Sequence, residues 1–121
     1  MRKTENGWAS SHFSTRELAC SCCGENKIQY EALKQLELLR IKLGRPVILN
    51  SAYRCSNHPE ERHKSTIGTH VQGIAFDIRC HPREVAKLVS IAYDLGFRGF
   101  GYAKSFLHID MREYDGGWFY S

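Results

Sequence analysis

The chain has 121 residues, of which 42% are hydrophobic and 25% are charged, values that disfavour an intrinsically disordered protein and predict one globular domain over residues 1–121. No apolar run reaches the roughly 20 residues that a membrane-spanning helix needs, so we expect no membrane span. The formal net charge of +4 is spread along the chain without a basic stripe, which disfavours nucleic acid as a partner and suits an anionic polymer.

The N-terminal segment MRKTENG is not followed by the apolar stretch of a secretory signal peptide. We therefore expect a chain that is made in the cytoplasm and that needs a separate delivery route if it acts outside the cell. We also expect the protein to be a monomer.

A short first helix is predicted near Ser14. Ser14 and Glu17 have the spacing of a capping box, in which each side chain bonds the backbone N–H of the other residue. Phe13 and Leu18 stand where a hydrophobic staple would place them. We expect this helix to end within residues 22–25.

The cysteines exclude a complete disulfide framework, because their number is odd. They also lack the two C-x-x-C pairs of a zinc ribbon, which disfavours a cysteine-metal nucleic-acid module. We expect free thiols, as in a reducing cytoplasm; a small second metal site or a redox-sensitive loop within residues 20–24 is the alternative. The five cysteines are Cys20, Cys22, Cys23, Cys55 and Cys80.

The main core helix is predicted over residues 29–43, where leucines recur every three or four positions until Gly44 and Pro46 stop the pattern. The short apolar run over residues 47–50 predicts a buried strand that leads into residues 51–54. The leucines of the helix are Leu33, Leu36, Leu39 and Leu43.

A loop is predicted over residues 57–67, which are polar and have no period. Loops in such positions commonly shape a substrate cleft. We expect His58 and His63 within this loop to be solvated and not to bind a metal.

Half of a candidate metal site lies in the sequence GTHVQGIAFD, residues 68–77. His70 offers an imidazole nitrogen and Asp77 a carboxylate oxygen, and both are zinc ligands. Gly73 disfavours one continuous helix and favours a turn into an extended run over residues 74–78. Such a turn would bring the two ligands toward one point.

The C-terminal part predicts one more helix over residues 82–96, with an apolar stripe, and strands over residues 97–102 and 106–112. The sequence Asp-Gly-Gly at residues 115–117 predicts a terminal hairpin turn. The whole pattern predicts an α+β fold, in which a small antiparallel sheet carries helices.

Three motifs, in this order, resemble the zinc D-alanyl-D-alanine carboxypeptidase and endopeptidase family, which trims bacterial cell walls. They are S-x-Y-R at residues 51–54, H-x-x-G-x-A-x-D at residues 70–77 and F-L-H-I-D at residues 106–110. The resemblance covers nearly the whole chain and implies the α+β fold shared by hedgehog domains and D-Ala-D-Ala peptidases.

The resemblance implies one Zn²⁺ ion held by His70, Asp77 and His108. Three protein ligands with an open fourth position are typical of a catalytic zinc. The implied function is that of a zinc metallopeptidase, a carboxypeptidase or an endopeptidase, which hydrolyses a peptide bond in peptidoglycan stem peptides. The implied source is a bacterium or a phage, and the implied site of action is the cell wall.

The S-x-Y-R motif implies that Arg54 binds the substrate, because a guanidinium can clamp a carboxylate or an oxyanion with two parallel hydrogen bonds. Ser51 and Tyr53 are the neighbouring substrate-binding candidates. We expect Ser51 to hydrogen-bond beside the site and Tyr53 to pack.

Asp110 is the candidate catalytic base, since strand alternation places it on the same face as His108. Branches of the family carry an acidic residue or a histidine just before the second His, where this chain has Ser105 and Phe106. The alternative role for Asp110 is to orient a metal ligand.

A rival hypothesis of another class is a non-catalytic binding module that keeps the zinc. Hedgehog signalling domains have a zinc centre within the same broad structural group, yet they are known for binding partners. Turnover of an isolated substrate is the observation that separates the two hypotheses.

Overall fold

The computed structural model describes residues 1–120, which form two sheets and three α-helices. Strands β1 and β2 form a hairpin, and the other five strands form one sheet in the order β3-β4-β6-β5-β7. Neighbouring strands are antiparallel except for the parallel pair of β5 and β7. The elements are β1 (Arg2–Thr4), β2 (Gly7–Ala9), α1 (Thr15–Leu18), α2 (Tyr30–Leu43), β3 (Leu49–Ser51), β4 (Ala75–Arg79), the 3₁₀ helix η1 (Pro82–Glu84), α3 (Val85–Asp94), β5 (Gly99–Tyr102), β6 (Phe106–Asp110) and β7 (Gly116–Phe119).

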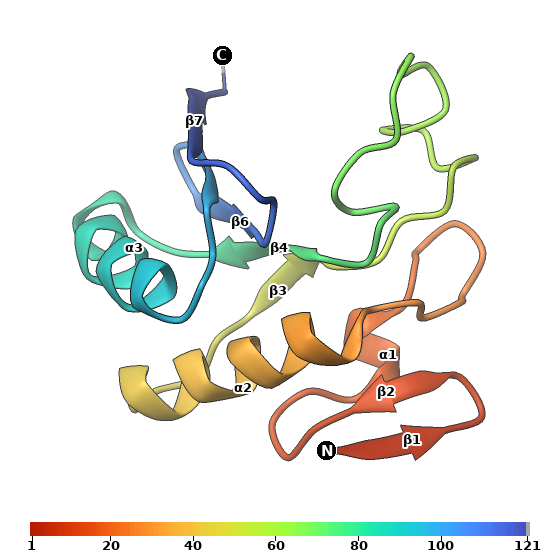
Figure 1. The fold of residues 1–121 in the computed structure, drawn as a ribbon, viewed down its shortest axis with the longest axis horizontal. Helices are drawn as coiled ribbons and strands as arrows, with labels where there is room; N and C mark the ends of the chain where they lie inside the picture. Colours follow the sequence, from red (N-terminus) through yellow and green to blue (C-terminus); the bar gives the residue numbers. More distant parts are fainter. Residues whose placement is uncertain (121) are drawn as a thin grey trace.

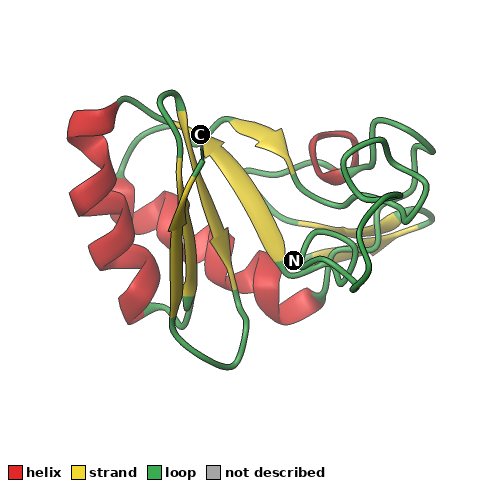
Figure 2. Cartoon of the chain, turned by 90° about the horizontal axis from the view of Figure 1, so that it is seen from above, coloured by secondary structure: helices red, strands yellow, loops and turns green. Residues whose placement is uncertain are grey.

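The predicted α+β class is confirmed, with helices α2 and α3 on one side of the large sheet and the long loop between β3 and β4 on the other (Figures 1 and 2). Side chains alternate along β4 and β6, so each strand sends one set of residues to the helices and the other set to the loop side. The set in the core is apolar and consists of Phe76, Ile78, Leu107 and Ile109. The polar residues Asp77 and His108 alternate with it and form a cross-strand pair.

The first helix begins as predicted, with Ser14 as N-cap and a complete capping box to Glu17. The predicted end at residues 22–25 is wrong, because the helix stops at Leu18. After it, the backbone N–H of Cys20 donates to the carbonyl of Glu25 at 2.8 Å, so residues 20–25 form a closed loop of their own.

The main helix is confirmed over Tyr30–Leu43, with its leucines buried and Gly44 in the left-handed conformation that ends it. The predicted strand over residues 47–50 is wrong in position and in burial. The observed strand is β3 (Leu49–Ser51), which forms the edge of the sheet and leaves Ile48 49% exposed. An edge strand pairs on one side only.

The predicted terminal hairpin is also wrong, because Gly116 and Gly117 lie inside strand β7 and not in a turn. Strand β6 already pairs with β4 on one side and with β5 on the other. The chain therefore passes β6 and adds β7 parallel to β5 at the free edge. Trp118 on β7 thereby lies opposite Gly101 of β5, with its ring 5.0 Å from the ring of His108 on β6.

The N-terminal hairpin of β1 and β2 was not predicted, because three-residue strands are too short to show an alternating pattern. The amide of Asn26 donates to the carbonyl of Trp8 at 2.9 Å and so fastens the hairpin to the loop before α2. None of the helices within residues 1–120 is both long and apolar enough to cross a membrane.

Candidate metal centre

A turn and two adjacent strands position the three predicted zinc ligands. His70 lies in the turn before β4, Asp77 lies in the middle of β4, and His108 lies opposite Asp77 on β6. Gly73 makes the turn with a φ of +77°, and a Cβ atom there would lie 2.2 Å from the carbonyl oxygen of Lys27. Only glycine fits this close approach and this backbone conformation, so the predicted turn through Gly73 is confirmed.

The three side chains converge on one buried point. Asp77 Oδ1 lies 3.2 Å from His70 Nε2 and 3.0 Å from His108 Nδ1. The three candidate ligand atoms all lie within 4.8 Å of one another. His70 and His108 are each 3% exposed and Asp77 is 5% exposed, so bulk water does not surround the donors.

The outer nitrogen of each imidazole has its own protein partner. His70 Nδ1 donates to the carbonyl of Ala52 at 2.6 Å, and His108 Nε2 donates to the carboxylate of Asp110 at 2.7 Å. These acceptors hold the protons on the outer nitrogens and leave lone pairs on the two nitrogens that face Asp77. Three lone-pair donors then face one point, an arrangement that a cation satisfies, so these residues fit a metal ion.

Burial would raise the pKa of Asp77, but hydrogen bonds and charge from His108 and His70 hold it well below the usual range. Burial would lower the pKa of His108, but the carboxylates of Asp110 and Asp77 raise it. The centre therefore favours an ionised Asp77 carboxylate next to positive charge, supplied by protons or by a metal ion.

Arg54 holds the second carboxylate oxygen of Asp77. Its Nη2 donates to Asp77 Oδ2 at 3.0 Å, its Nη1 donates to Glu61 Oε2 at 3.0 Å, and its Nε donates to Ser51 Oγ at 3.0 Å. These contacts use three of the five N–H donors of the guanidinium and leave two. Arg54 thus orients Asp77 and also lines the cleft above it.

Glu61 is a functional candidate that the sequence reasoning missed. It lies in the polar loop between β3 and β4, yet it is only 5% exposed and bonds both Arg54 and Lys64. Burial would raise the pKa of Glu61, but hydrogen bonds from Arg54 and Lys64 lower it. Nothing in the local sequence distinguishes Glu61 from the exposed Glu60 beside it.

Asp110 is fully buried and lies on the outer side of His108, away from Asp77. Arg112 donates to its carboxylate through Nε at 2.8 Å and Nη2 at 2.7 Å. Burial would raise the pKa of Asp110, but Arg112 and His108 hold it well below the usual range. This placement favours the role of orienting His108 over the role of catalytic base.

An open cleft of about 1330 Å³ lies over the centre. One wall comes from the loop between β3 and β4, including His63, and the other includes Trp118 and Tyr120 near the C-terminus. The ring of Trp118 lies 5.0 Å from the ring of His108. Sequence reasoning missed this aromatic wall, because it assigned the segment to a hairpin.

The three residues of the S-x-Y-R motif are not equivalent in the structure. Ser51 and Arg54 line the cleft, and Ser51 forms the expected hydrogen bond beside the site. Tyr53 is 6% exposed, belongs to the hydrophobic core and is not among the cleft-lining residues of the described chain. It packs, as expected, and the structure does not bring it to the substrate side.

A family model described as Peptidase M15 matches residues 11–110 of the chain. The matched range contains the three converging ligands together with Arg54, Glu61 and Asp110. It leaves out β1, β2 and β7, so the aromatic wall of the cleft lies outside it. No curated protein matches the chain.

Proposed function

The chain belongs to the peptidase M15 family, a family of metal-dependent peptidases, and from this premise we propose that it is a zinc metallopeptidase acting on peptidoglycan stem peptides. The proposal covers a carboxypeptidase and an endopeptidase, from a bacterium or a phage. The observation that carries it is the convergence of three buried lone-pair donors below an open cleft. The cell wall is the proposed site of action, and the formal charge of +4 favours approach to that anionic polymer.

We assign one zinc ion to His70, Asp77 and His108, whose donor set leaves a fourth position open, as catalytic zinc sites do. When bound, the ion supplies Lewis-acid chemistry, polarising a peptide carbonyl and easing the loss of a proton from water. The chain supplies the orientation of all three ligands, through Ala52 and Asp110 for the imidazoles and Arg54 for the carboxylate.

Arg54 is the proposed substrate-binding residue as well. It lies in the cleft wall beside Asp77 and keeps two N–H donors beyond those that Ser51, Glu61 and Asp77 use. These donors suit a peptide carboxylate or a developing oxyanion. The bonds to Glu61 and Asp77 fix the plane of the guanidinium before substrate arrives, which lowers the entropic cost of binding.

The catalytic base remains a prediction with three candidates, one buried and two exposed. Asp110 bonds His108 and Arg112 and lies below the cleft surface. Glu60 and Glu113 are exposed and line the cleft. We expect the proton acceptor to be one of these exposed carboxylates if Asp110 only orients His108.

The direct test is to incubate the zinc-loaded protein with isolated peptidoglycan and to identify released fragments by mass spectrometry. We expect stem-peptide fragments, whose new termini name the cleaved bond, and no fragments from His108→Ala. Folded, zinc-loaded protein that releases nothing from peptidoglycan of several cross-link types would contradict the peptidase proposal.

The alternative is a zinc-containing binding module that does not hydrolyse its partner. One observation favours it: within residues 1–120 the carboxylates bonded to His108 are those of Asp77 and Asp110, and Asp110 is already bonded to two side chains. The same experiment separates the two functions, since a binding module sediments with peptidoglycan but leaves its mass spectrum unchanged.

The metal assignment has its own test, which does not depend on finding the substrate. We expect His70→Ala and His108→Ala each to lose one zinc ion per chain relative to the unaltered protein, as measured by elemental analysis of folded samples. Far-ultraviolet circular dichroism checks the fold. Variants that stay folded with unchanged zinc content would show that these histidines are not ligands.

A further inference from the structure

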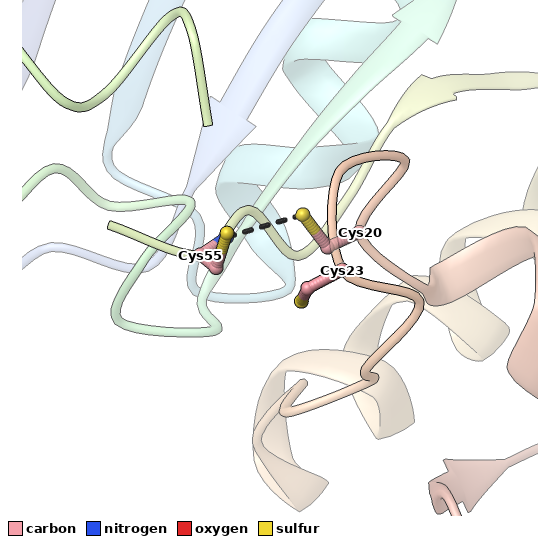
Figure 3. A group of neighbouring side chains, drawn as sticks. All are labelled: Cys20, Cys23 and Cys55. Atoms are coloured by element: carbon pink, nitrogen blue, oxygen red, sulfur yellow. Dashed lines mark hydrogen bonds between the residues drawn. The ribbon is translucent and has the colours of Figure 1, made fainter. Parts of the chain in front are cut away.

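A second group of metal-binding side chains lies away from the His-Asp-His centre. The thiols of Cys20, Cys23 and Cys55 come together with all three sulfur atoms within 4.8 Å of one another. Figure 3 shows that Cys20 and Cys23 extend from one loop and Cys55 from a segment far along the chain. None of the cysteines is in a disulfide within the described part of the chain.

The loop that carries two of these thiols is closed and specific in shape. Cys20 and Cys23 have the C-x-x-C spacing with which one turn supplies two zinc ligands. The carbonyl of Cys20 accepts the N–H of Gly24 at 2.8 Å, and Gly24 has a φ of +79°. The backbone thereby reverses direction and brings both sulfur atoms to one side.

Cys20 sits in the environment of a thiolate. Its sulfur accepts backbone N–H groups from Cys22 and Cys55, each at 3.3 Å. Burial would raise the pKa of the Cys20 thiol, but hydrogen bonds from the backbone of Cys55, Cys23 and Cys22 lower it to about 7. A hydrogen bond at Glu25 would lower the pKa of Cys23, but burial and the neighbouring thiols raise it, and burial raises the pKa of Cys55. A metal ligand must be deprotonated, so the hydrogen bonds favour the thiolate at Cys20, and the convergence of the three sulfur atoms is what supports a metal site.

The segment that carries Cys55 offers a fourth ligand. His58 follows Cys55 by three positions, so the two segments read C-x-x-C and C-x-x-H. The N–H of His58 donates to the carbonyl of Cys55 at 3.0 Å. His58 Nε2 lies 3.2 Å from Ser21 Oγ on the loop that carries Cys20 and Cys23, and His58 Nδ1 accepts the N–H of Glu60 at 3.1 Å. The imidazole lies outside the group of three sulfur atoms, so it must turn to join them.

We propose that Cys20, Cys23, Cys55 and His58 hold a second, structural zinc ion. Three cysteines and one histidine form a common closed set for structural zinc, and thiolates select zinc over hard cations such as magnesium. Binding releases the thiol protons and joins two loops whose nearest ligands, Cys23 and Cys55, lie 32 positions apart in sequence.

The consequence for the molecule is local stiffness next to the cleft. Cys55 directly follows Arg54, whose guanidinium holds Asp77. The backbone N–H of Tyr53 also donates to the carbonyl of Leu18 at 3.1 Å, just before the cysteine loop. A zinc ion at the thiols would therefore anchor the segment of Arg54 from its other side. The inference does not depend on the proposed peptidase activity.

Cobalt substitution tests the site on the full chain. Co²⁺ bound to thiolates gives an intense sulfur-to-metal charge-transfer band, which a His-Asp-His site cannot produce. We expect the metal-stripped, reduced protein to show this band after Co²⁺ is added, and His70→Ala to retain it. We expect Cys23→Ser to lose most of the band.

Matched controls come from the other thiols. Cys80→Ser removes a buried cysteine outside the cluster, and Cys22→Ser removes an exposed cysteine on the same loop. Both should retain the band at full intensity. Loss of the band in Cys22→Ser together with full metal affinity in His58→Ala would show that His58 is not the fourth ligand and would overturn the proposed ligand set.

Zinc content gives the second measurement. We expect two zinc ions in the reduced protein, one in His108→Ala and one in Cys23→Ser. If Cys23→Ser does not fold, a mercurial thiol reagent added to the folded, unaltered protein should release one zinc ion. Absence of the charge-transfer band in protein whose five thiols all react as free thiols would overturn the proposal, as would a disulfide within the cluster in protein purified under reducing conditions.

Discussion

The His-Asp-His centre and the cysteine cluster both bring three ligand atoms within 4.8 Å, but the fold supports them differently. The first lies on a turn and two paired strands, with every ligand buried and bonded to a second protein group. The second lies on two loops, where Cys20 is buried but Cys23 is exposed. The sheet therefore shapes the first site before metal binds, whereas the second depends more on the ion for its shape.

The two sites meet in one short segment, residues 52–55. The carbonyl of Ala52 orients His70, the guanidinium of Arg54 orients Asp77, and Cys55 belongs to the cysteine cluster. The N–H of Arg54 also donates to the carbonyl of His70 at 3.4 Å. A change in the conformation of the cysteine loop can therefore move residues 52–55 and alter the orientation of His70 and Asp77.

The largest effect should come from Arg54→Lys, because Arg54 directly precedes Cys55 in the shared segment and its guanidinium bonds Asp77. A lysine cannot reproduce three simultaneous bonds to Ser51, Glu61 and Asp77. We expect kcat/KM to fall by a factor of about 10² or more, the usual cost of losing one such donor. Steady-state kinetics with the peptide identified from peptidoglycan would measure it.

Arg62→Lys is the matched control, because Arg62 is exposed on the same loop and should leave turnover unchanged. Zinc content and melting temperature should be measured on both variants. An Arg54→Lys protein with full activity would remove Arg54 from the substrate site, and one with only a lowered melting temperature would make Arg54 structural.

A smaller effect should follow Asp110→Asn, which weakens the orientation of His108 and leaves the thiols untouched. If Asp110 holds the outer proton of His108, we expect zinc affinity of the His-Asp-His centre to fall about 10- to 100-fold, as measured by competition with a chelator. The control is Asp115→Asn, an exposed carboxylate that follows β6. Unchanged zinc affinity with turnover reduced about 10² to 10⁴ would instead support Asp110 as the base.

The His-Asp-His centre was largely predictable from sequence, because two of its ligands lie within one short segment, residues 70–77. Strand alternation and the Gly73 turn place His70 and Asp77, and the resemblance adds His108 on a neighbouring strand. The residues that orient these ligands were harder to assign. Asp110 was expected beside His108, but sequence spacing alone does not say which imidazole nitrogen its carboxylate reaches.

The cysteine cluster, the position of Trp118 and the burial of Glu61 were not predictable from sequence, because each depends on contacts between distant segments. The cysteine cluster needs Cys55 to meet a loop more than thirty positions earlier, and no periodicity encodes that meeting. Trp118 reached the cleft only because β7 crosses to the free edge of β5, which a local hairpin signal at Gly116 and Gly117 could not show. Glu61 was hidden for the same reason within a polar loop.

The smallest predicted effect concerns Glu61, the carboxylate that connects the loop to Arg54. Its folded-state pKa is lowered, since hydrogen bonds from Arg54 and Lys64 outweigh burial, which would raise it. A lowered folded-state pKa stabilises the fold above the unfolded-state pKa of about 4.3, and this stabilisation is lost as the pH falls through the folded-state pKa. Glu61→Gln should therefore lower the free energy of unfolding by about 1 kcal/mol at neutral pH and by progressively less below pH about 4.

Urea unfolding at a series of pH values would measure the difference between the Glu61→Gln variant and the unaltered protein. Glu60→Gln is the control for stability, because the neighbouring Glu60 is exposed and should show little difference at any pH. If Glu61→Gln changed the free energy of unfolding by the same amount from neutral to acid pH, the contact of Glu61 with Arg54 would depend on packing and not on charge. The loop would then position Arg54 through packing alone. The orientation of Asp77 by Arg54 would depend on the sheet and on the hydrogen bond between Arg54 and Ser51.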